Sequence, residues 1–195
     1  MSKYQFEPSP NFGRSEHPFA TWENGFTADD IQKVITAGGL RTQTEATLDT
    51  GYTESVIRTS QTSWLDLAED TAWLYERLSF IARQLNGQFF GFDLFGFNEH
   101  MQFTVYQEGG HYTWHQDSGV SDTAPRKLSM VVQLTDPSEY EGGDLQILSG
   151  PNETTVSKQL GQVTAFPSYM LHRVTPVTKG VRRTLVVWVT GPSFK

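Results

Sequence analysis

The second half of the chain breaks into many short stretches that have the length and composition of β-strands. Eight of them follow one another in about 100 residues, a density typical of a β-sandwich or a jelly roll. Turn signals separate the stretches, namely Gly109-Gly110, Asp136-Pro137, Gly142-Gly143 and Gly150-Pro151. We expect strands at residues 89–94, 101–107, 127–134, 143–148, 154–157, 162–166, 170–174 and 182–190.

Two helical patterns precede these strands. The first begins at Thr27, which can cap the free amides of a helix, and ends at Gly38-Gly39. The second covers residues 68–86, where apolar side chains recur every three or four positions. Because both helices precede the strands and do not alternate with them, the order argues against a parallel sheet of βαβ units. We therefore expect a mainly β fold, a double-stranded β-helix (a cupin-like jelly roll) with its N-terminal helices packed on one face.

Residues 40–60 lie between these helices and are rich in threonine. They alternate around Thr50-Gly51, a pattern typical of a β-hairpin. At 195 residues, with 37% hydrophobic and 19% charged residues, the chain has the size and composition of one globular domain. We expect a single domain over residues 1–195, with a helix and hairpin extension at 1–62 and a helix plus jelly-roll core at 63–195.

The composition excludes several classes of function. The chain has no cysteine, which excludes disulfide scaffolds, thiol nucleophiles, iron–sulfur clusters and cysteine-ligated zinc. It has 15 basic and 22 acidic residues and no basic stripe, which argues against a nucleic-acid partner. Residues 1–7 lack the apolar core of a secretory signal, and no apolar run reaches the length of a membrane span. We expect a cytoplasmic protein without a membrane partner.

The residues left for chemistry are His115-Gln116-Asp117, His172 and Arg182. Side chains two apart on a strand point to the same side, so His115 and Asp117 can face a barrel mouth that His172 completes. Two imidazoles and one carboxylate are the ligand set of the non-haem Fe(II) oxygenases. An isolated His-x-Asp also occurs by chance, and an isolated histidine is commonly structural. The combination, on a predicted jelly roll, therefore carries the metal-site hypothesis.

The span from Trp64 to Trp188 resembles the 2-oxoglutarate/Fe(II)-dependent dioxygenases of the prolyl 4-hydroxylase type, and among them the bacterial PKHD-type hydroxylases. The resemblance implies that His115, Asp117 and His172 ligate Fe(II). It also implies 2-oxoglutarate as cosubstrate, together with O2, and L-ascorbate as a reductant. The matching motifs are Gln102–Tyr106, His115–Asp117, Glu141–Leu145, His172–Val177, Lys179–Arg182 and Val187–Trp188.

The same resemblance implies that Arg182 binds the far carboxylate of 2-oxoglutarate. Arginine suits a carboxylate because its planar fork donates two parallel hydrogen bonds. Arg183 is the competing candidate, but the ten-residue step from His172 favours Arg182. Thr184 follows on the same strand face, and Tyr106 lies on the strand before the His-x-Asp motif. Both are candidates to hydrogen-bond the cosubstrate.

The implied reaction is hydroxylation of a C–H bond, with decarboxylation of 2-oxoglutarate to succinate and CO2. The resemblance favours a prolyl residue in a peptide or protein as the substrate, although related enzymes also take small molecules. Asp117 favours hydroxylation over halogenation, because related halogenases have a small residue in place of this carboxylate. Trp188 can pack beside the pocket or in the core, and Trp114 can line the substrate site or face outward.

Two other functions are compatible with the same ligands. A non-catalytic jelly-roll binding module would hold metal without redox chemistry, and a cupin-type hydrolase or isomerase would use zinc or manganese. A binding module has no need of the cation at Arg182, which favours the dioxygenase. Dependence on 2-oxoglutarate separates the dioxygenase from both alternatives.

Overall fold

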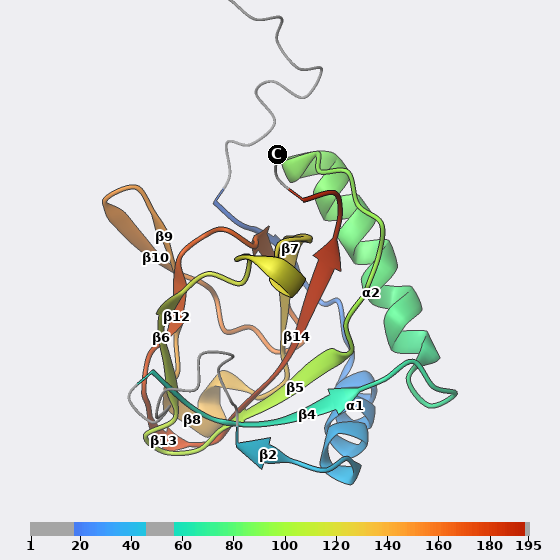
Figure 1. Cartoon of the computed structure of the whole chain (residues 1–195). Coiled ribbons are helices and arrows are strands. Elements are labelled where there is room, and N and C mark those ends of the chain that lie inside the picture. Colours follow the sequence, from blue (N-terminus) through green and yellow to red (C-terminus); the bar gives the residue numbers. More distant parts are fainter. Residues whose placement is uncertain (1–17, 46–56, 194–195) are drawn as a thin grey trace, which may run out of the picture.

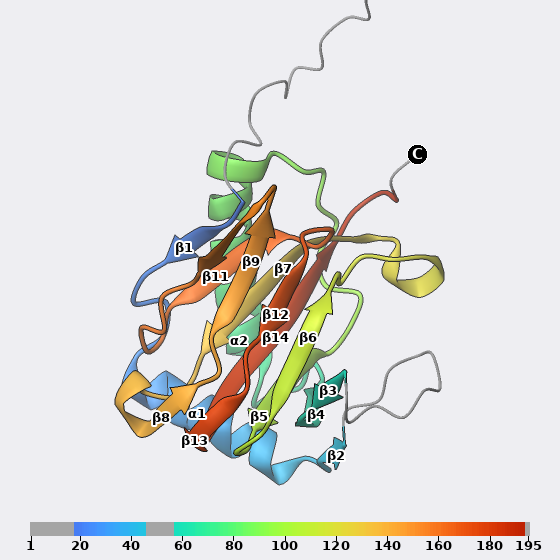
Figure 2. The ribbon, with the colours of Figure 1, turned by 90° about the vertical axis from the view of Figure 1, so that its left-hand side faces the viewer.

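The computed structural model describes residues 18–45 and 57–193 of the chain. Two antiparallel sheets face each other, a short two-stranded sheet lies at one end, and two helices cover the outer side of the larger sheet (Figures 1 and 2). In the part of the chain described, neither helix has the length and apolar composition that a membrane span requires.

The strand order of each sheet brings together segments that are far apart in the sequence. The larger sheet has the order β1 (Ala20–Trp22), β11 (Val163–Pro167), β7 (Arg126–Gln133), β14 (Arg182–Thr190), β5 (Met101–Tyr106), β4 (Gln61–Leu65) and β2 (Thr44–Glu45). The smaller sheet has the order β10 (Asn152–Thr155), β9 (Leu145–Ser149), β12 (His172–Val174), β6 (His111–His115) and β3 (Arg58–Thr59). The third sheet pairs β13 (Val177–Gly180) with β8 (Tyr140–Gly142).

The two faces of the larger sheet differ because side chains alternate along a strand. One face forms the main apolar core with the helices, and the other lines a cavity between the two sheets. In β14, the core side carries Leu185, Val187 and Val189, and the cavity side carries Arg182, Thr184, Val186 and Trp188. β5 alternates in the same way, so polar side chains reach the interior of the sandwich without interrupting the core.

The first predicted helix is confirmed as α1 (Ala28–Leu40). Thr27 and Asp30 form a capping box, in which the Thr27 hydroxyl accepts from the Asp30 amide (3.2 Å) and the Asp30 carboxylate accepts from the Thr27 amide (3.0 Å). The sequence suggested that this helix ends at Gly38-Gly39, whereas α1 continues through Leu40. A side chain at Gly38 would collide with the Phe103 ring, so this glycine lets α1 pack closely on β5.

The second predicted helix is confirmed as α2 (Ala72–Leu85), and its apolar stripe is buried. Arg77 of α2 donates a 2.5 Å hydrogen bond to Asp30 of α1, which ties the two helices together. Burial by itself raises the pKa of Asp30, but the hydrogen bonds from Thr27 and Arg77 outweigh it and lower this pKa to about 2.

The strand predicted at residues 89–94 is wrong. A π-helix (Asn86–Phe90) continues α2 there, and Gly91 ends it in the left-handed conformation at φ 71°. The Asn86 side chain hydrogen-bonds both the amide and the carbonyl of Phe92, which holds the following segment in an irregular path. The aromatic residues favoured a strand by propensity, but they pack against the main core, and this tertiary contact overrides the local preference.

The hairpin predicted at residues 40–60 is also wrong in its pairing. β2 pairs with β4, whereas β3 joins the other sheet beside β6. Among the described residues, β2 and β3 do not pair with each other, and the chain crosses from the smaller to the larger sheet between β3 and β4. The predicted turn at Thr50-Gly51 lies outside the described residues. Alternation indicates a strand but does not name its partner, which is why the sequence suggested a simple hairpin.

The other seven predicted strands are present, with bounds shifted by at most two residues. The predicted strand 182–190 has the bounds of β14. The list of predicted strands omitted β1, β4, β6, β8 and β13, which are short or flanked by polar residues. The jelly-roll expectation thus agrees with the observed two-sheet arrangement and with the helices on one face.

Candidate metal centre

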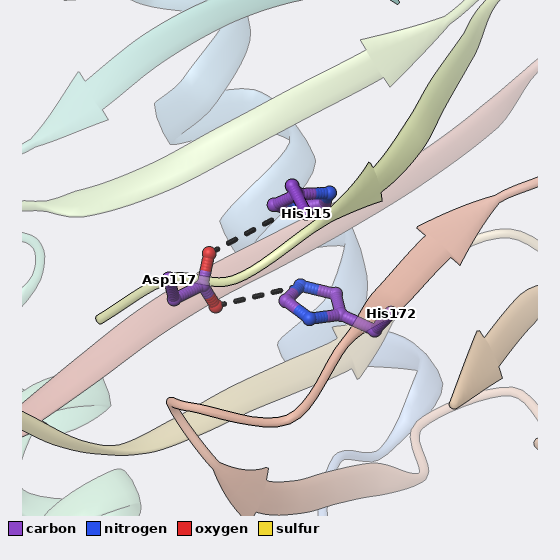
Figure 3. A group of neighbouring side chains, drawn as sticks. All are labelled: His115, Asp117 and His172. Atoms are coloured by element: carbon purple, nitrogen blue, oxygen red, sulfur yellow. Dashed lines mark ion pairs between the residues drawn. The ribbon is translucent and has the colours of Figure 1, made fainter. Parts of the chain in front are cut away.

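His115, Asp117 and His172 converge in the cavity between the sheets (Figure 3). β6 and β12 are antiparallel neighbours, and His115 and His172 stand opposite each other in their register. Asp117 follows β6 at the second position after His115. Its carboxylate oxygens lie 3.7 Å from Nε2 of His115 and 3.5 Å from Nε2 of His172. All three ligand atoms lie within 4.8 Å of one another, a spacing that one metal ion can bridge.

Backbone carbonyls orient both imidazole rings. The Nδ1 of His115 lies 2.8 Å from the carbonyl of Thr113, and the Nδ1 of His172 lies 2.9 Å from the carbonyl of Met170. A carbonyl only accepts hydrogen bonds, so each Nδ1 carries the proton and each Nε2 keeps its lone pair. This is the arrangement in which histidine ligates a metal through Nε2, with its ring held by an outer hydrogen bond.

Asp117 is held as an ionised carboxylate. Ser129 donates a 2.6 Å hydrogen bond to its Oδ2, and the Asp117 amide donates to the carbonyl of Ser168 (2.9 Å). Burial alone raises the pKa of Asp117, but His172, His115 and the Ser129 hydroxyl outweigh it, so the pKa is lowered. Burial, with a contribution from His172, lowers the pKa of His115 to about 3. At neutral pH the site thus offers an anionic oxygen and a neutral imidazole, the protonation states that metal binding requires.

Arg182 lies in the same cavity, which has a volume of about 400 Å³. Arg182 is only 3% exposed, and its Nε has no hydrogen-bond partner. In the register of β14 and β5 it stands opposite Tyr106, and its guanidinium lies 5.4 Å from the centre of the Tyr106 ring. Thr184 lines the cavity two positions further along β14, whereas Arg183 does not line it. The strand alternation therefore brings Arg182, Thr184 and Tyr106 together with the triad.

Gly143 makes room for the Arg182 side chain. It has φ +61°, and a Cβ at this position would lie 3.0 Å from Cδ of Arg182. Any other residue would therefore be strained in its backbone and would press on the arginine. The sequence indicated only a turn at Gly142-Gly143, and the tight approach to Arg182 is visible only in the folded chain.

Several cavity residues were not identified from the sequence. Arg58 of β3 is 8% exposed, and its guanidinium lies 4.8 Å from the centre of the Tyr112 ring. The Tyr112 ring in turn stacks on the His115 ring, with 3.4 Å between centroids. Arg126 forms a two-bond ion pair with Glu99 at the cavity wall. None of these residues belongs to a local motif, so no signal along the chain pointed to them.

The two tryptophans left open by the sequence have different positions. Trp188 lines the cavity, is 6% exposed, and lies under the Arg126 guanidinium at 3.9 Å from the ring centre. Trp114 does not line the cavity and lies 4.6 Å from the Arg173 guanidinium. Arg173 is also paired with Glu153 of β10. Trp188 is therefore a wall of the site, and Trp114 is not.

Comparisons with known proteins agree with this geometry. Residues 101–190 match the family model described as the 2OG-Fe(II) oxygenase superfamily. A PKHD-type hydroxylase of Alteromonas mediterranea is 38% identical over 93 residues, which are 45% of this chain and 41% of that relative. A PKHD-type hydroxylase of Synechococcus sp. (strain CC9902) is 41% identical over 83 residues, covering 42% of this chain and 36% of the relative. The chain thus spans about two fifths of the length of the curated relatives it matches.

The fold is also that of solved structures. A prolyl-4-hydroxylase from Pseudomonas putida superposes with a TM-score of 0.71 at 22% identity, covering 91% of this chain and 95% of that chain. A prolyl hydroxylase from Trichoplax adhaerens, solved with a hypoxia inducible factor peptide fragment, has a TM-score of 0.74 at 15% identity, covering 90% and 84%. These matches confirm the jelly-roll prediction. The His-Asp-His triad and Arg182 all lie within residues 101–190, the part of the chain that matches the 2OG-Fe(II) oxygenase superfamily.

Proposed function

We propose that this chain is a 2-oxoglutarate- and Fe(II)-dependent dioxygenase that hydroxylates a prolyl residue in a peptide or protein. His115, Asp117 and His172 would hold the iron. The donor set fits this ion, since the imidazoles of His115 and His172 and the ionised carboxylate of Asp117 lie close together in the cavity. Three protein ligands leave coordination positions open toward the cavity for the cosubstrate and O2.

The single observation that carries the proposal is the unpaired Nε of buried Arg182. A guanidinium with an unused donor, enclosed in the cavity that holds the triad, requires an anionic partner. The far carboxylate of 2-oxoglutarate supplies one, because this molecule has a carboxylate at each end. Thr184 and Tyr106 line the same cavity beside the guanidinium, and their hydroxyl groups would hydrogen-bond the same carboxylate. A binding module has no need of this cation, whereas a cupin-type hydrolase would use it for an anionic substrate, so dependence on 2-oxoglutarate separates the two enzymes.

The proposed reaction balances as substrate C–H plus O2 plus 2-oxoglutarate giving substrate C–OH, succinate and CO2. One oxygen atom enters the product hydroxyl and the other enters succinate. The iron, when bound, supplies the redox chemistry that activates O2. The chain supplies the positions of the reacting groups: Arg182 would bind the far end of 2-oxoglutarate, and Ser129 and the backbone carbonyls orient the ligands.

Two observations support a prolyl substrate. Aromatic side chains form the walls beside the triad: Tyr112 stacks on His115, and Trp188 lies 6.3 Å from Trp64, which is 42% exposed at the mouth. A compact, apolar pyrrolidine ring is complementary to such walls. In addition, the Pseudomonas putida and Trichoplax adhaerens proteins of the same fold are prolyl hydroxylases by name, the latter solved with a peptide.

The test is an anaerobic titration of metal-free protein with Fe(II) and then 2-oxoglutarate, followed by the visible spectrum. We expect a weak charge-transfer band that requires both additions and is absent from an Asp117→Ala, His172→Ala double variant. Turnover of proline-containing peptides to hydroxylated product, with equal amounts of succinate, would then test the substrate. If Fe(II) binds but no band forms, the dioxygenase proposal is wrong, and a cupin-type hydrolase or a binding module becomes the better interpretation.

A further inference from the structure

Three arginines line the described cavity: Arg182 has a role in the proposed reaction, Arg126 is paired with Glu99, and Arg58 has neither. Arg58 is 8% exposed and lies on β3, at the edge of the smaller sheet. Its Nε donates to the Ser60 hydroxyl (2.8 Å) and its Nη2 donates to Oε1 of Gln102 (2.9 Å). Both partners are neutral, and these two bonds use two of the five N–H groups of the guanidinium. The charge of Arg58 is therefore solvated by polar groups but not neutralised by them.

The other charges of the cavity have partners once the cosubstrate is bound. The carboxylates that line the described cavity are Glu99 and Asp117. Glu99 is paired with Arg126, and Asp117 faces the metal position. The two carboxylates of 2-oxoglutarate would neutralise Arg182 and the remaining charge of a divalent metal. Among the described residues that line the cavity, one positive charge then remains, and it resides on Arg58.

The position of Arg58 relates this charge to the reacting carbon. Arg58 stands opposite Tyr112 in the pairing of β3 with β6, and its guanidinium lies over the Tyr112 ring. The Tyr112 ring stacks on His115, a proposed metal ligand. The guanidinium is thus one aromatic ring away from the metal centre, so a group bound to it would lie beside a C–H bond presented to the metal.

We infer that Arg58 binds a carboxylate of the substrate, and that the substrate is a prolyl unit with a carboxylate next to the hydroxylated ring. This inference rests on the proposed function. A buried cation without a counter-charge is costly, and a substrate carboxylate would remove that cost while orienting the ring. The carboxylate has two possible sources, the terminal carboxylate of the prolyl unit itself or the side chain of an adjacent acidic residue.

Matched pairs of small probes test the inference by binding, without turnover. N-acetyl-L-proline is compared with N-acetyl-L-prolinamide, and N-acetyl-Pro-Asp-amide with N-acetyl-Pro-Asn-amide. Each is titrated calorimetrically into the anaerobic protein loaded with Fe(II) and 2-oxoglutarate. We expect the wild-type protein to bind the charged member of at least one pair roughly 10- to 100-fold more tightly, the range for a hydrogen bond between charged groups. The pair that shows the preference identifies the source of the carboxylate.

Variants of Arg58 assign the preference to this residue. Arg58→Gln should bind both members of the pair equally, and Arg58→Lys should keep part of the preference because it keeps the charge. The matched control is Arg183→Gln, since Arg183 does not line the cavity, and it should keep the wild-type preference in full. An unchanged affinity for 2-oxoglutarate and an unchanged thermal unfolding midpoint show that each variant is folded.

Two results would overturn the inference: no preference in either pair with the wild-type protein, or a preference that survives in Arg58→Gln. The proposed function fails by a different measurement, because the charge-transfer band with Fe(II) and 2-oxoglutarate forms without any of these probes. A protein that shows the band but no preference therefore retains the dioxygenase assignment and loses only the role of Arg58.

Discussion

Replacing Arg182 with glutamine removes a buried charge from the proposed cosubstrate site and keeps a polar side chain. Arg182 is 3% exposed and its Nε is unpaired, and in the proposed site its guanidinium would be the charged partner of the far carboxylate of 2-oxoglutarate. Truncating one partner of a buried charged pair costs about 2–5 kcal/mol. At about 1.4 kcal/mol per factor of ten, 2-oxoglutarate should bind roughly 30-fold to several thousand-fold more weakly. The affinity for Fe(II) should change little, since Arg182 is not a ligand.

The assay is an anaerobic titration of the Fe(II) protein with 2-oxoglutarate. Arg183→Gln is the neighbouring control and should bind 2-oxoglutarate as the wild-type protein does. A second control uses 2-oxobutyrate, which lacks the far carboxylate and should bind wild-type and Arg182→Gln protein equally. If Arg182→Gln keeps the wild-type affinity for 2-oxoglutarate, or if Arg183→Gln loses it, the assignment of Arg182 is wrong.

Three further predictions concern the surroundings of the site and the helices. Ser129→Ala removes a 2.6 Å hydrogen bond to Asp117. The affinity for Fe(II) at neutral pH should therefore fall roughly 10- to 100-fold in a metal titration, whereas the same substitution at a surface serine outside the cavity should leave it unchanged. Gly143→Ala should weaken the binding of 2-oxoglutarate but not that of Fe(II), because its Cβ would lie 3.0 Å from Cδ of Arg182. Equal loss of affinity for both ligands would contradict this mechanism. Asp30→Asn should lower the free energy of unfolding at pH 7 by about 2 kcal/mol, since the folded-state pKa of Asp30 is lowered from 3.8 to about 2. That stability is fully present above about pH 4 and is lost as the pH falls through 2, so urea unfolding of the two proteins should converge at low pH.

Local patterns predicted most of the elements because they depend on near neighbours. The threonine cap and the apolar side chains at every third or fourth position predicted α1 and α2. Alternation predicted the bounds of β14 that are observed. The errors came where tertiary contacts outweigh local preference. Residues 86–92 carry aromatic side chains that favour a strand, yet the core and the Asn86 hydrogen bonds hold them in a π-helix and an irregular segment. The segment at 40–60 divides between two sheets, which alternation cannot indicate.

The site was predictable to a similar degree and for a similar reason. His115 and Asp117 are two residues apart, so the sequence alone shows that one strand can present both. His172 and Arg182 were candidates from the sequence as well, but the resemblance to a known family, and not periodicity, gave Arg182 its role. Arg58, Glu99 and Arg126 also line the cavity but lie in no motif, since each comes from a different strand or loop.

By itself, the sequence predicted the class of fold from local patterns and their order, the pairing of His115 with Asp117 from their two-residue spacing, and Arg182 over Arg183 from the ten-residue step after His172. The tertiary structure alone decided that β12 lies beside β6, which brings His172 to His115, and that β3 joins the same sheet, which places Arg58 over Tyr112. Strand pairing is a long-range choice made by the packing of the whole core, and period-two alternation carries no information about the partner. The charge of the cavity, on which the proposed substrate preference rests, is therefore a property of the assembled sheets.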